Sequence, residues 1–314
     1  KSRLINRMLS PTAVLSPSAV LSSVPFSLGT YGTAVALAGH LTSTQVLALN
    51  CGTYGVAHIA IAAWRQRLRG RAEQKGGSDA WGAGIELGIY ILAGATCQSL
   101  SLQHCSVPRV AFITQMSCVL VPLVETLLSR LPSQRIIGAA FLSLAGVAQL
   151  LYAPERGATA NVNSRIGDAL ASAAAIFYSM HILRLGTHAR RHDSAELAFT
   201  KVRTQCVGMA VLLLLKLVLQ VDVTAWRLAI ALPVRAAPIV LWTGLISCAL
   251  PMAAQGYGQA HVCAAYASII YATAPLVSVL SAALVLGQRV GRHAMLGGTL
   301  IMFGHLMTIS ITAR

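Results

Sequence analysis

Long apolar stretches alternate with short polar breaks along almost the whole chain. A helix that crosses the bilayer needs about 20 mostly apolar residues. Ten stretches have a suitable length and composition, and they span residues 13–38, 45–64, 81–101, 108–128, 136–153, 166–185, 196–220, 236–258, 263–286 and 294–312. The pattern therefore predicts an all-α integral membrane protein with ten transmembrane helices.

The polar breaks indicate how these helices are connected. Residues 65–79 and 187–194 read as charged loops. The links at His104–Ser106 and Ala260–Val262 are so short that they require tight antiparallel hairpins. Residues 153–165 contain Asn and Gly and separate the fifth stretch from the sixth. We therefore expect two halves of five helices each.

An internal repeat supports this division. Residues 111–151 and 267–307 share one order of features: a small residue, an apolar stretch, Pro-Leu-Val, a second apolar stretch, a short basic turn and a Gly-containing apolar helix. A repeat with an odd number of spans is inverted in the membrane, as in many secondary transporters. The predicted fold is thus two inverted five-helix repeats. Its parts are an N-terminal tail (1–12), a first repeat (13–153), a linker (154–165) and a second repeat (166–314).

The composition agrees with a membrane protein. Hydrophobic residues make up 55% of the chain and charged residues 11%, whereas soluble domains carry about 25% charged residues. A secreted disulfide scaffold, a disordered chain and an ordinary cytosolic enzyme are therefore excluded. The seven cysteines form no CxxC pair and read as small buried hydrophobes.

The net charge of +15 bears on topology rather than on nucleic acid. With the N-terminus inside, 14 of the 24 Lys and Arg residues fall on the inner side and seven on the outer side. Cytoplasmic loops carry an excess of Lys and Arg, so we expect both termini in the cytoplasm. No basic patch is interleaved with stacking aromatics, so no nucleic-acid partner is expected. The Ser-rich, acid-free first 23 residues fit either a cytoplasmic tail or a transit-peptide remnant, which leaves the plasma membrane and an organelle membrane, such as a plastid one, open.

Several segments resemble the EamA-type transporters of the drug/metabolite transporter superfamily. They are SCVLVPLVETLLSRLPS (117–133), the ILR-containing segment 167–193, YASIIYATAPLVSVLSAALVLGQRV (266–290) and LGGTLIMFG (296–304). The resemblance covers roughly residues 20–312 as two EamA-like repeats. The chain departs from the family at Ala274, where many members have Glu before the Pro, and at Gln288, which replaces the Glu of LGE.

The resemblance implies a ten-helix transporter with both termini in the cytoplasm. Its central cavity would open alternately to either side, lined mainly by the first, third, fourth, sixth, eighth and ninth helices. Family members export amino acids, metabolites or drugs, and relatives carry sugar phosphates and nucleotide sugars. A mechanism that uses the two replaced acids is not carried over to this chain.

Polar residues deep in the predicted spans are candidates for a solute site. Such residues are costly in hydrocarbon unless they face a partner or a wet cavity. Amides and phenols donate and accept hydrogen bonds, which suits a zwitterion or a polyol. The residues that we expect to bind the solute are Gln98, Gln115, Tyr178, His181, Gln255 and Tyr271. The alternative for each is an interhelical hydrogen bond, worth about 0.6 kcal/mol.

Two titratable residues, Glu125 and His181, are candidates for proton or ion coupling. An imidazole titrates near physiological pH. Glu125 lies near the inner end of its span, where it could instead pair with Arg130 or extend to the headgroups. Pro122 and Pro275 occupy related places in the two repeats and are candidate hinges, because proline interrupts helical hydrogen bonding.

Other charged residues near the inner side are expected to be solvated. Lys201 and Arg203 lie within two turns of the inner end of the seventh span, so we expect them to reach the interface or Glu196. A solute-anion role for Arg203 is the alternative. His188 and His192 are four residues apart, but no further ligands cluster with them, so a basic loop is favoured over a metal site.

These features predict a secondary transporter of a small organic metabolite, amino acid or drug-like solute, an exporter or exchanger that works by alternating access. No G-x-x-x-x-G-K-[ST] motif is present, so ATP-driven pumping is not expected. Nucleotide-sugar or sugar-phosphate antiport is the alternative, although the ninth span holds no cation for a phosphate. A membrane-embedded enzyme and a non-transporting scaffold are more remote. No cofactor is expected; the expected partners are the lipid bilayer and the solute, and a homodimer is left open.

Overall fold

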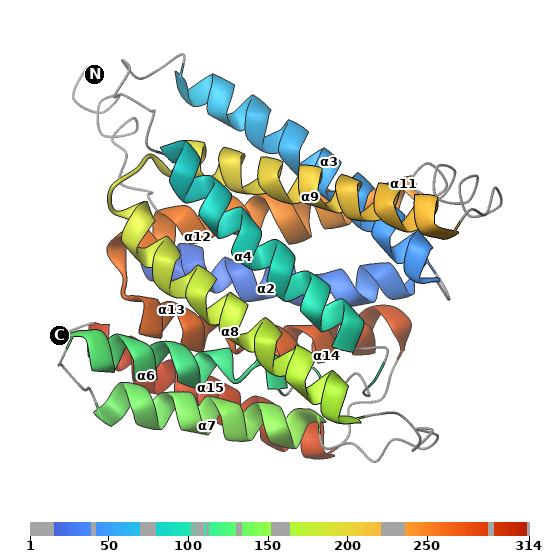
Figure 1. The fold of residues 1–314 in the computed structure, drawn as a ribbon. Helices are drawn as coiled ribbons and strands as arrows, with labels where there is room; N and C mark the ends of the chain where they lie inside the picture. Colours follow the sequence, from blue (N-terminus) through green and yellow to red (C-terminus); the bar gives the residue numbers. More distant parts are fainter. Residues whose placement is uncertain are drawn as a thin grey trace, which may run out of the picture.

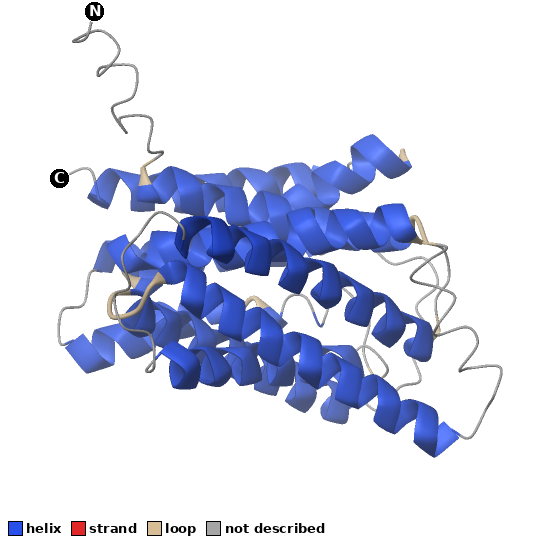
Figure 2. Ribbon diagram, turned by 90° about the horizontal axis from the view of Figure 1, so that it is seen from above, coloured by secondary structure: helices blue, strands red, loops and turns tan. Residues whose placement is uncertain are grey.

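The structure is a computed structural model of the 314-residue chain. It describes residues 16–38, 42–69, 80–101, 104, 110, 113–129, 134–151, 164–220, 236–287 and 292–312. The regular elements of these residues are helices, and no strand occurs among them (Figure 2). The predicted tail 1–12 and almost all of the predicted linker 154–165 lie outside the described residues.

The helices overlap the predicted segments, and several of them extend beyond the predicted ends. Those of the first half are α2 (Pro17–Ala36), α3 (Ser43–Arg69), α4 (Ala80–Ser101), α6 (Ser117–Ser129) and α7 (Gln134–Leu151). Those of the second half are α8 (Ser164–Ala189), α9 (Ser194–Gln220), α11 (Ala237–Trp242), the π-helix η1 (Thr243–Ala249), α12 (Leu250–His261), α13 (Ala264–Tyr271), α14 (Ala274–Leu286) and α15 (Arg292–Thr312). A helix or a run of helices therefore lies in each predicted segment (Figure 1).

Many of these helices are long and apolar enough to cross a membrane. Among the described residues, six stretches qualify by length and hydropathy: Thr44–Leu68, Ala80–Ser101, Arg165–Ala189, Ser194–Leu219, Ala237–His261 and Ala264–Leu286. Shorter apolar helices cover Ser117–Leu128 and Met295–Met307. The prediction of a multi-pass, all-α integral membrane protein is thus confirmed, while the ten-span inverted repeat stays a prediction.

Side chains fix several helix ends. Pro17 opens α2 behind Ser16, whose Oγ accepts a hydrogen bond from the backbone N–H of Ala19 at 3.3 Å. Asp193 does the same for α9, because its carboxylate accepts the N–H groups of Ala195 and Glu196 at 3.0 and 3.1 Å. These N-caps satisfy donors that have no partner inside the helix. Gly287 ends α14 in the left-handed conformation (φ 66°), which glycine adopts without strain.

The structure differs from the sequence prediction in two of the later spans. The eighth is not one regular helix but contains η1, where the N–H of Leu250 bonds five residues back to Leu245 O. The ninth is broken at Ala272–Thr273. Pro275 therefore sits in the first turn of α14, where its missing N–H costs no hydrogen bond. Only Pro122 lies inside a helix as expected, so the two candidate hinges have different local structures.

Most helices lie roughly along one direction (Figures 1 and 2). The contacts pair α7 with α15 and α3 with α9, and α4 packs between α8 and α9. On the other side of the bundle, α2 packs on α12 and α14, and α3 packs on η1. Segments from the two halves are thus interleaved rather than stacked as separate bodies.

One end of the bundle gathers the turn between α8 and α9, and we call it the α8–α9 end. The start of α2 and the ends of α3, α6, α12 and α15 lie there too, as the predicted topology requires. The residue pairs whose proximity places them there are Gly256 with Ser194, Gly258 with Leu21, Arg65 with Glu196, Glu125 with Ala265 and Gly304 with Ser143. The exposed Arg190 and Arg191 are also at this end.

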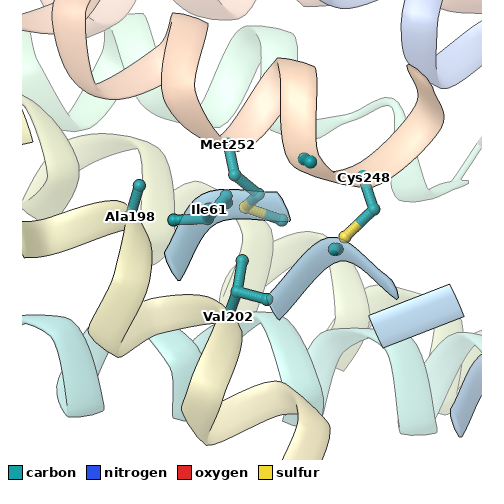
Figure 3. Packing of buried hydrophobic residues seen from close by; sticks show 7 residues of the cluster. Ile61, Ala198, Val202, Cys248 and Met252 are labelled. Atoms are coloured by element: carbon teal, nitrogen blue, oxygen red, sulfur yellow. The ribbon is translucent and has the colours of Figure 1, made fainter. Parts of the chain in front are cut away.

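An apolar cluster joins the two halves near this end. Ile61 of α3, Val202 of α9 and Met252 of α12 converge there, with Ala198 and Cys248 beside them (Figure 3). Each of these side chains is almost fully buried. The ends of α3 and α8 also extend past their predicted limits of 64 and 185, and ion pairs of their last turns, described below, account for this.

Close approach of α4 to α9 generates a first prediction. A Cβ at Gly88 would lie 2.6 Å from Thr204 Cβ and 2.9 Å from the carbonyl oxygen of Lys201. Gly88→Ala must therefore push the helices apart, and overpacking of this kind costs about 1–3 kcal/mol. We expect a lower melting temperature in detergent. Gly82→Ala on the same helix is the control, since no heavy atom lies within 4 Å of its added Cβ; equal melting temperatures for the two variants would contradict the packing.

The direction of α8 generates a second prediction. Arg165 and Arg191 are exposed and flank the apolar stretch of α8 at opposite ends. A membrane-impermeant maleimide should therefore label Arg165→Cys and Arg191→Cys from opposite sides of sealed vesicles. The unsubstituted protein sets the background from its native cysteines. Labelling of both variants from one side would show that α8 does not cross.

Candidate functional site

Two of the predicted solute-binding residues contact each other in the interior. The hydroxyl of Tyr178 in α8 donates a 2.7 Å hydrogen bond to Gln98 Oε1 in α4. The ring of Tyr178 packs against Gly94, where the missing side chain makes room for it. The pair therefore lies at the α4–α8 contact.

A second phenol cluster adjoins this pair and was missed by sequence reasoning. Tyr31 of α2 donates a 2.5 Å hydrogen bond to Asn50 Oδ1 of α3. Tyr54 of α3 packs against the apolar cluster that contains Ile61 and Met252, and it lies within electrostatic range of Tyr31 and Tyr178. The sequence does contain a signal for this cluster, because Tyr31 and Asn50 are polar residues inside apolar stretches. The prolines in the stretch that contains Tyr31 make this signal harder to recognise.

A buried lysine forms the centre of a third cluster. Lys201 of α9 is 1% exposed, and its Nζ donates to Gln255 Oε1 of α12 at 3.3 Å. His181 of α8 is 4% exposed and close enough for the charge of Lys201 to act on it. The expectation that Lys201 reaches the interface or Glu196 is therefore wrong. The cause is the packing of α4 and α12 over α9, which closes the path to the surface.

The remaining predicted residues are Tyr271 and Gln115. Tyr271 at the end of α13 accepts a 3.1 Å hydrogen bond from Gln259 Nε2 of α12. Gln115 lies in the turn before α6 and is half-buried. The structure thus brings His181 and Gln255 together at Lys201 and joins Gln98 to Tyr178, whereas the side chain of Gln115 forms no hydrogen bond with another described residue.

Glu125 contacts the start of another helix. Its Oε2 accepts a 2.6 Å hydrogen bond from the backbone N–H of Ala265, at the first turn of α13. A carboxylate is stabilised at the positive end of a helix. The side chain is half-buried, so it bridges α6 and α13 rather than extending to the headgroups. Arg130 lies outside the described residues.

Ion pairs tie the helices together at the α8–α9 end. Arg184 of α8 donates twice to Glu86 of α4, at 2.6 and 3.0 Å. His188 also contacts Glu86, at 2.9 Å. Bidentate pairs of this kind are stronger than single hydrogen bonds. They account for the extension of α8 beyond its predicted end.

A second pair involves the last turns of α3. Arg65 Nε donates to Glu196 at 2.7 Å, and its guanidinium lies 4.3 Å from the centre of the Phe199 ring. Glu196 is thus engaged by Arg65 rather than by Lys201. Arg203 instead lies over the ring of Trp81 at 4.9 Å.

The two histidines of the 187–194 segment differ in their surroundings. His188 and His192 are neighbours, with ring centres 5.9 Å apart. No group of three or more potential metal ligands occurs among the described residues. The expected solvated loop is only half right, since His188 is largely buried against Glu86.

A surface groove lies away from all of these polar groups. Leu276, Val279, Met302 and Phe303 line it between α14 and α15. Its walls are apolar, so it offers no hydrogen-bonding chemistry for a polar solute.

The arrangement of helices indicates a general class of protein, and the comparison with known families then narrows it. Long apolar helices enclose buried amides, phenols and a lysine, and ion pairs join the helices at one end; this is the architecture of a multi-pass helical membrane protein. The model of the EamA-like transporter family matches residues 165–310. The match confirms the resemblance over the second half of the chain, and it supports an EamA-type member of the drug/metabolite transporter superfamily.

Comparisons of fold and of sequence add little about function. One crystal structure of a protein is similar with a TM-score of 0.73 and 17% identity, covering 95% of this chain and 98% of that one. At this identity the likeness concerns the fold alone. No curated protein matches the sequence.

The Tyr178–Gln98 bond generates a third prediction. Tyr178→Phe and Gln98→Leu should each lower the free energy of unfolding, and the coupling between them should be about 0.6 kcal/mol, the average for interhelical bonds in membranes. A double-mutant cycle in detergent measures this term. Tyr257→Phe is the control, since the hydroxyl of Tyr257 bonds to none of the described residues. Additive single effects would contradict the bond.

Proposed function

We propose that the protein is a secondary transporter of a small organic solute, built from two inverted five-helix repeats and working by alternating access. The observation that carries the proposal is a two-fold pattern in the helix contacts. Counting along each half pairs α2 with α8, α3 with α9, α4 with α11–η1–α12, α6 with α13–α14, and α7 with α15.

The contacts between helices match under this pairing. The contact of α4 with α8 corresponds to that of α12 with α2. The contact of α4 with α9 corresponds to that of η1 with α3, and the contact of α6 with α8 to that of α14 with α2. The contacts α3–α9 and α7–α15 are their own counterparts. Such a pattern is expected of two copies related by a two-fold axis.

The helix directions agree with an inversion. The start of α2 lies at the α8–α9 end, whereas α8 finishes there. Likewise α3 finishes and α9 starts there, and α6 finishes where α13 starts. Paired helices thus run in opposite directions, which supports repeats of opposite orientation in the membrane. Inverted repeats place the solute site near the midplane between them.

The buried polar groups supply a solute site in that region. Tyr178 and Gln98 offer a phenol and an amide, and His181 and Gln255 lie beside Lys201. The clusters draw on α4, α8 and α12, which are the third, sixth and eighth helices of the predicted cavity lining. Polar groups deep in a membrane protein mark substrate or ion pathways.

The contacts at the α8–α9 end would form the closed gate. Arg65–Glu196 joins α3 to α9, Glu86–Arg184 joins α4 to α8, and Glu125 joins α6 to α13. Opening toward this end requires these bonds to separate. Pro122 and the break before Pro275 lie on α6 and α14, where the helices can bend.

Transport in proteoliposomes tests the proposal. Purified protein is reconstituted, and uptake and counterflow are measured for a panel of amino acids, organic acids, sugars and cationic drugs. We expect flux for one class, lowered by His181→Gln and Tyr271→Phe without loss of folded protein. Tyr257→Phe and protein-free liposomes are the controls.

The outcomes separate transport from the alternatives. Flux that is unchanged in both variants would show that these residues only join helices. No flux for any class, with folded protein in both orientations, would overturn the proposed function. If transport is proton-coupled through His181, His181→Gln also flattens its pH dependence, because an imidazole titrates in this range.

A further inference from the structure

Lys201 is a buried cation without a carboxylate partner. It is 1% exposed, and its ammonium contacts only the amide oxygen of Gln255, at 3.3 Å, among the described residues. Nearby carboxylates are engaged elsewhere: Glu86 by Arg184 and His188, and Glu196 by Arg65. An ammonium removed from water is costly unless an anion compensates it.

The groups around Lys201 are also incompletely bonded. His181 Nε2 is buried and makes no hydrogen bond to a described residue. Gln205 lies one turn further along α9 and is 0% exposed, and both polar atoms of its amide lack partners in the described structure. Buried polar atoms are rarely left unpaired, so this region is suited to a polar guest.

Three helices bring the cluster to one depth. Lys201 is seven residues from the start of α9, Gln255 six from the end of α12, and His181 eight from the end of α8. At 1.5 Å per residue these positions lie about 9–12 Å from the α8–α9 end. Gly84 and Gly88 have no side chain, so α4 packs directly against the backbone of α9 at Lys201. This close contact fixes the position of the lysine.

The chemistry of the cluster selects the charge of its guest. Its members are one cation, two amides and an imidazole, with the thiol of Cys248 as the other titratable group that is coupled to Lys201. None of these groups repels an anion at neutral pH. A single ammonium matches one negative charge, whereas a phosphate dianion calls for more cations or for the bidentate contacts of arginine.

We propose that Lys201, together with Gln255 and His181, binds the carboxylate of the transported solute. The solutes are then small organic acids and amino acids with one free carboxylate. This assignment rests on the proposed transport function and adds the substrate class to it. Lys201 acts as the fixed counter-ion, and the neighbouring amides orient the carboxylate.

Thermal stabilisation of the purified, full-length protein in detergent tests the assignment. The probes are matched pairs that differ at the carboxylate: benzoate and benzamide, lactate and lactamide, leucine and leucinamide. A ligand that binds only the folded state raises the melting temperature. We expect at least one carboxylate, but not its amide, to do so.

Substitution of the lysine supplies the second readout. Lys201→Met should weaken carboxylate binding at least tenfold and, because it removes an uncompensated charge, leave the melting temperature without ligand equal or higher. A structural lysine would instead lower it. Arg203→Gln is the control on the same helix and should keep the carboxylate response. If Lys201→Met does not fold, Lys201→Gln replaces it in the same measurements.

The possible results differ in which proposal they overturn, the carboxylate site or the transport function. Equal stabilisation by acid and amide, a response to glucose 6-phosphate instead of carboxylates, a response that persists in Lys201→Met, or no response to any carboxylate overturns the assignment. Flux of neutral solutes with no carboxylate response keeps the transporter and rejects the anion site. A carboxylate response that depends on Lys201, without flux in proteoliposomes, keeps the site and rejects transport.

Discussion

The bilayer obliges every backbone polar group to find its partner within the protein, and the rest of the structure follows from this constraint. The described residues meet it with helices throughout. Where a helix is interrupted, neighbouring groups restore the bonds. In η1 the bonds shift to a spacing of five residues just before Pro251, which has no N–H to donate. At the break before α14, the N–H of Thr273 bonds to Ile270 O.

Many buried side chains follow the same constraint. Thr53 and Thr243 bond each other at 2.7 Å where α3 crosses η1, and Thr33 bonds Ser281 between α2 and α14. Buried polar atoms without a partner among the described residues occur in several helices, and His181 Nε2 and the amide of Gln205 are among them. The region of Lys201 differs from the other places because a buried ammonium lies there with the unpaired groups.

Hydropathy predicted the positions of the helices because the number of consecutive apolar residues in a span can be read from the sequence without knowing how the helices pack. The Pro-Leu-Val repeat predicts two related halves, and the matching helix contacts support that proposal. The breaks at η1 and at Ala272–Thr273 were not predicted, although each is followed within two residues by a proline, Pro251 or Pro275, which is a local signal for an interrupted helix.

The candidate site was predictable in composition but not in pairing. Gln98 and Tyr178 stood out as polar residues in apolar stretches, yet nothing in their spacing indicated that they bond each other across α4 and α8. Lys201 was misplaced for the same reason. A long side chain near a helix end extends to the surface or into the core, depending on which helices pack around it. Here α4 and α12 cover the route of the Lys201 side chain to the surface, so it extends inward.

The hydrogen bond of Glu125 has a mechanical consequence. Its carboxylate holds the first turn of α13, and only Val262 and Cys263 separate that turn from the end of α12. A displacement of α6 would therefore pull on the α12–α13 corner, which carries Gln259 and, further back, Gln255. In the proposed transport cycle, this one carboxylate would couple the motion of α6 to that of α12 and α13.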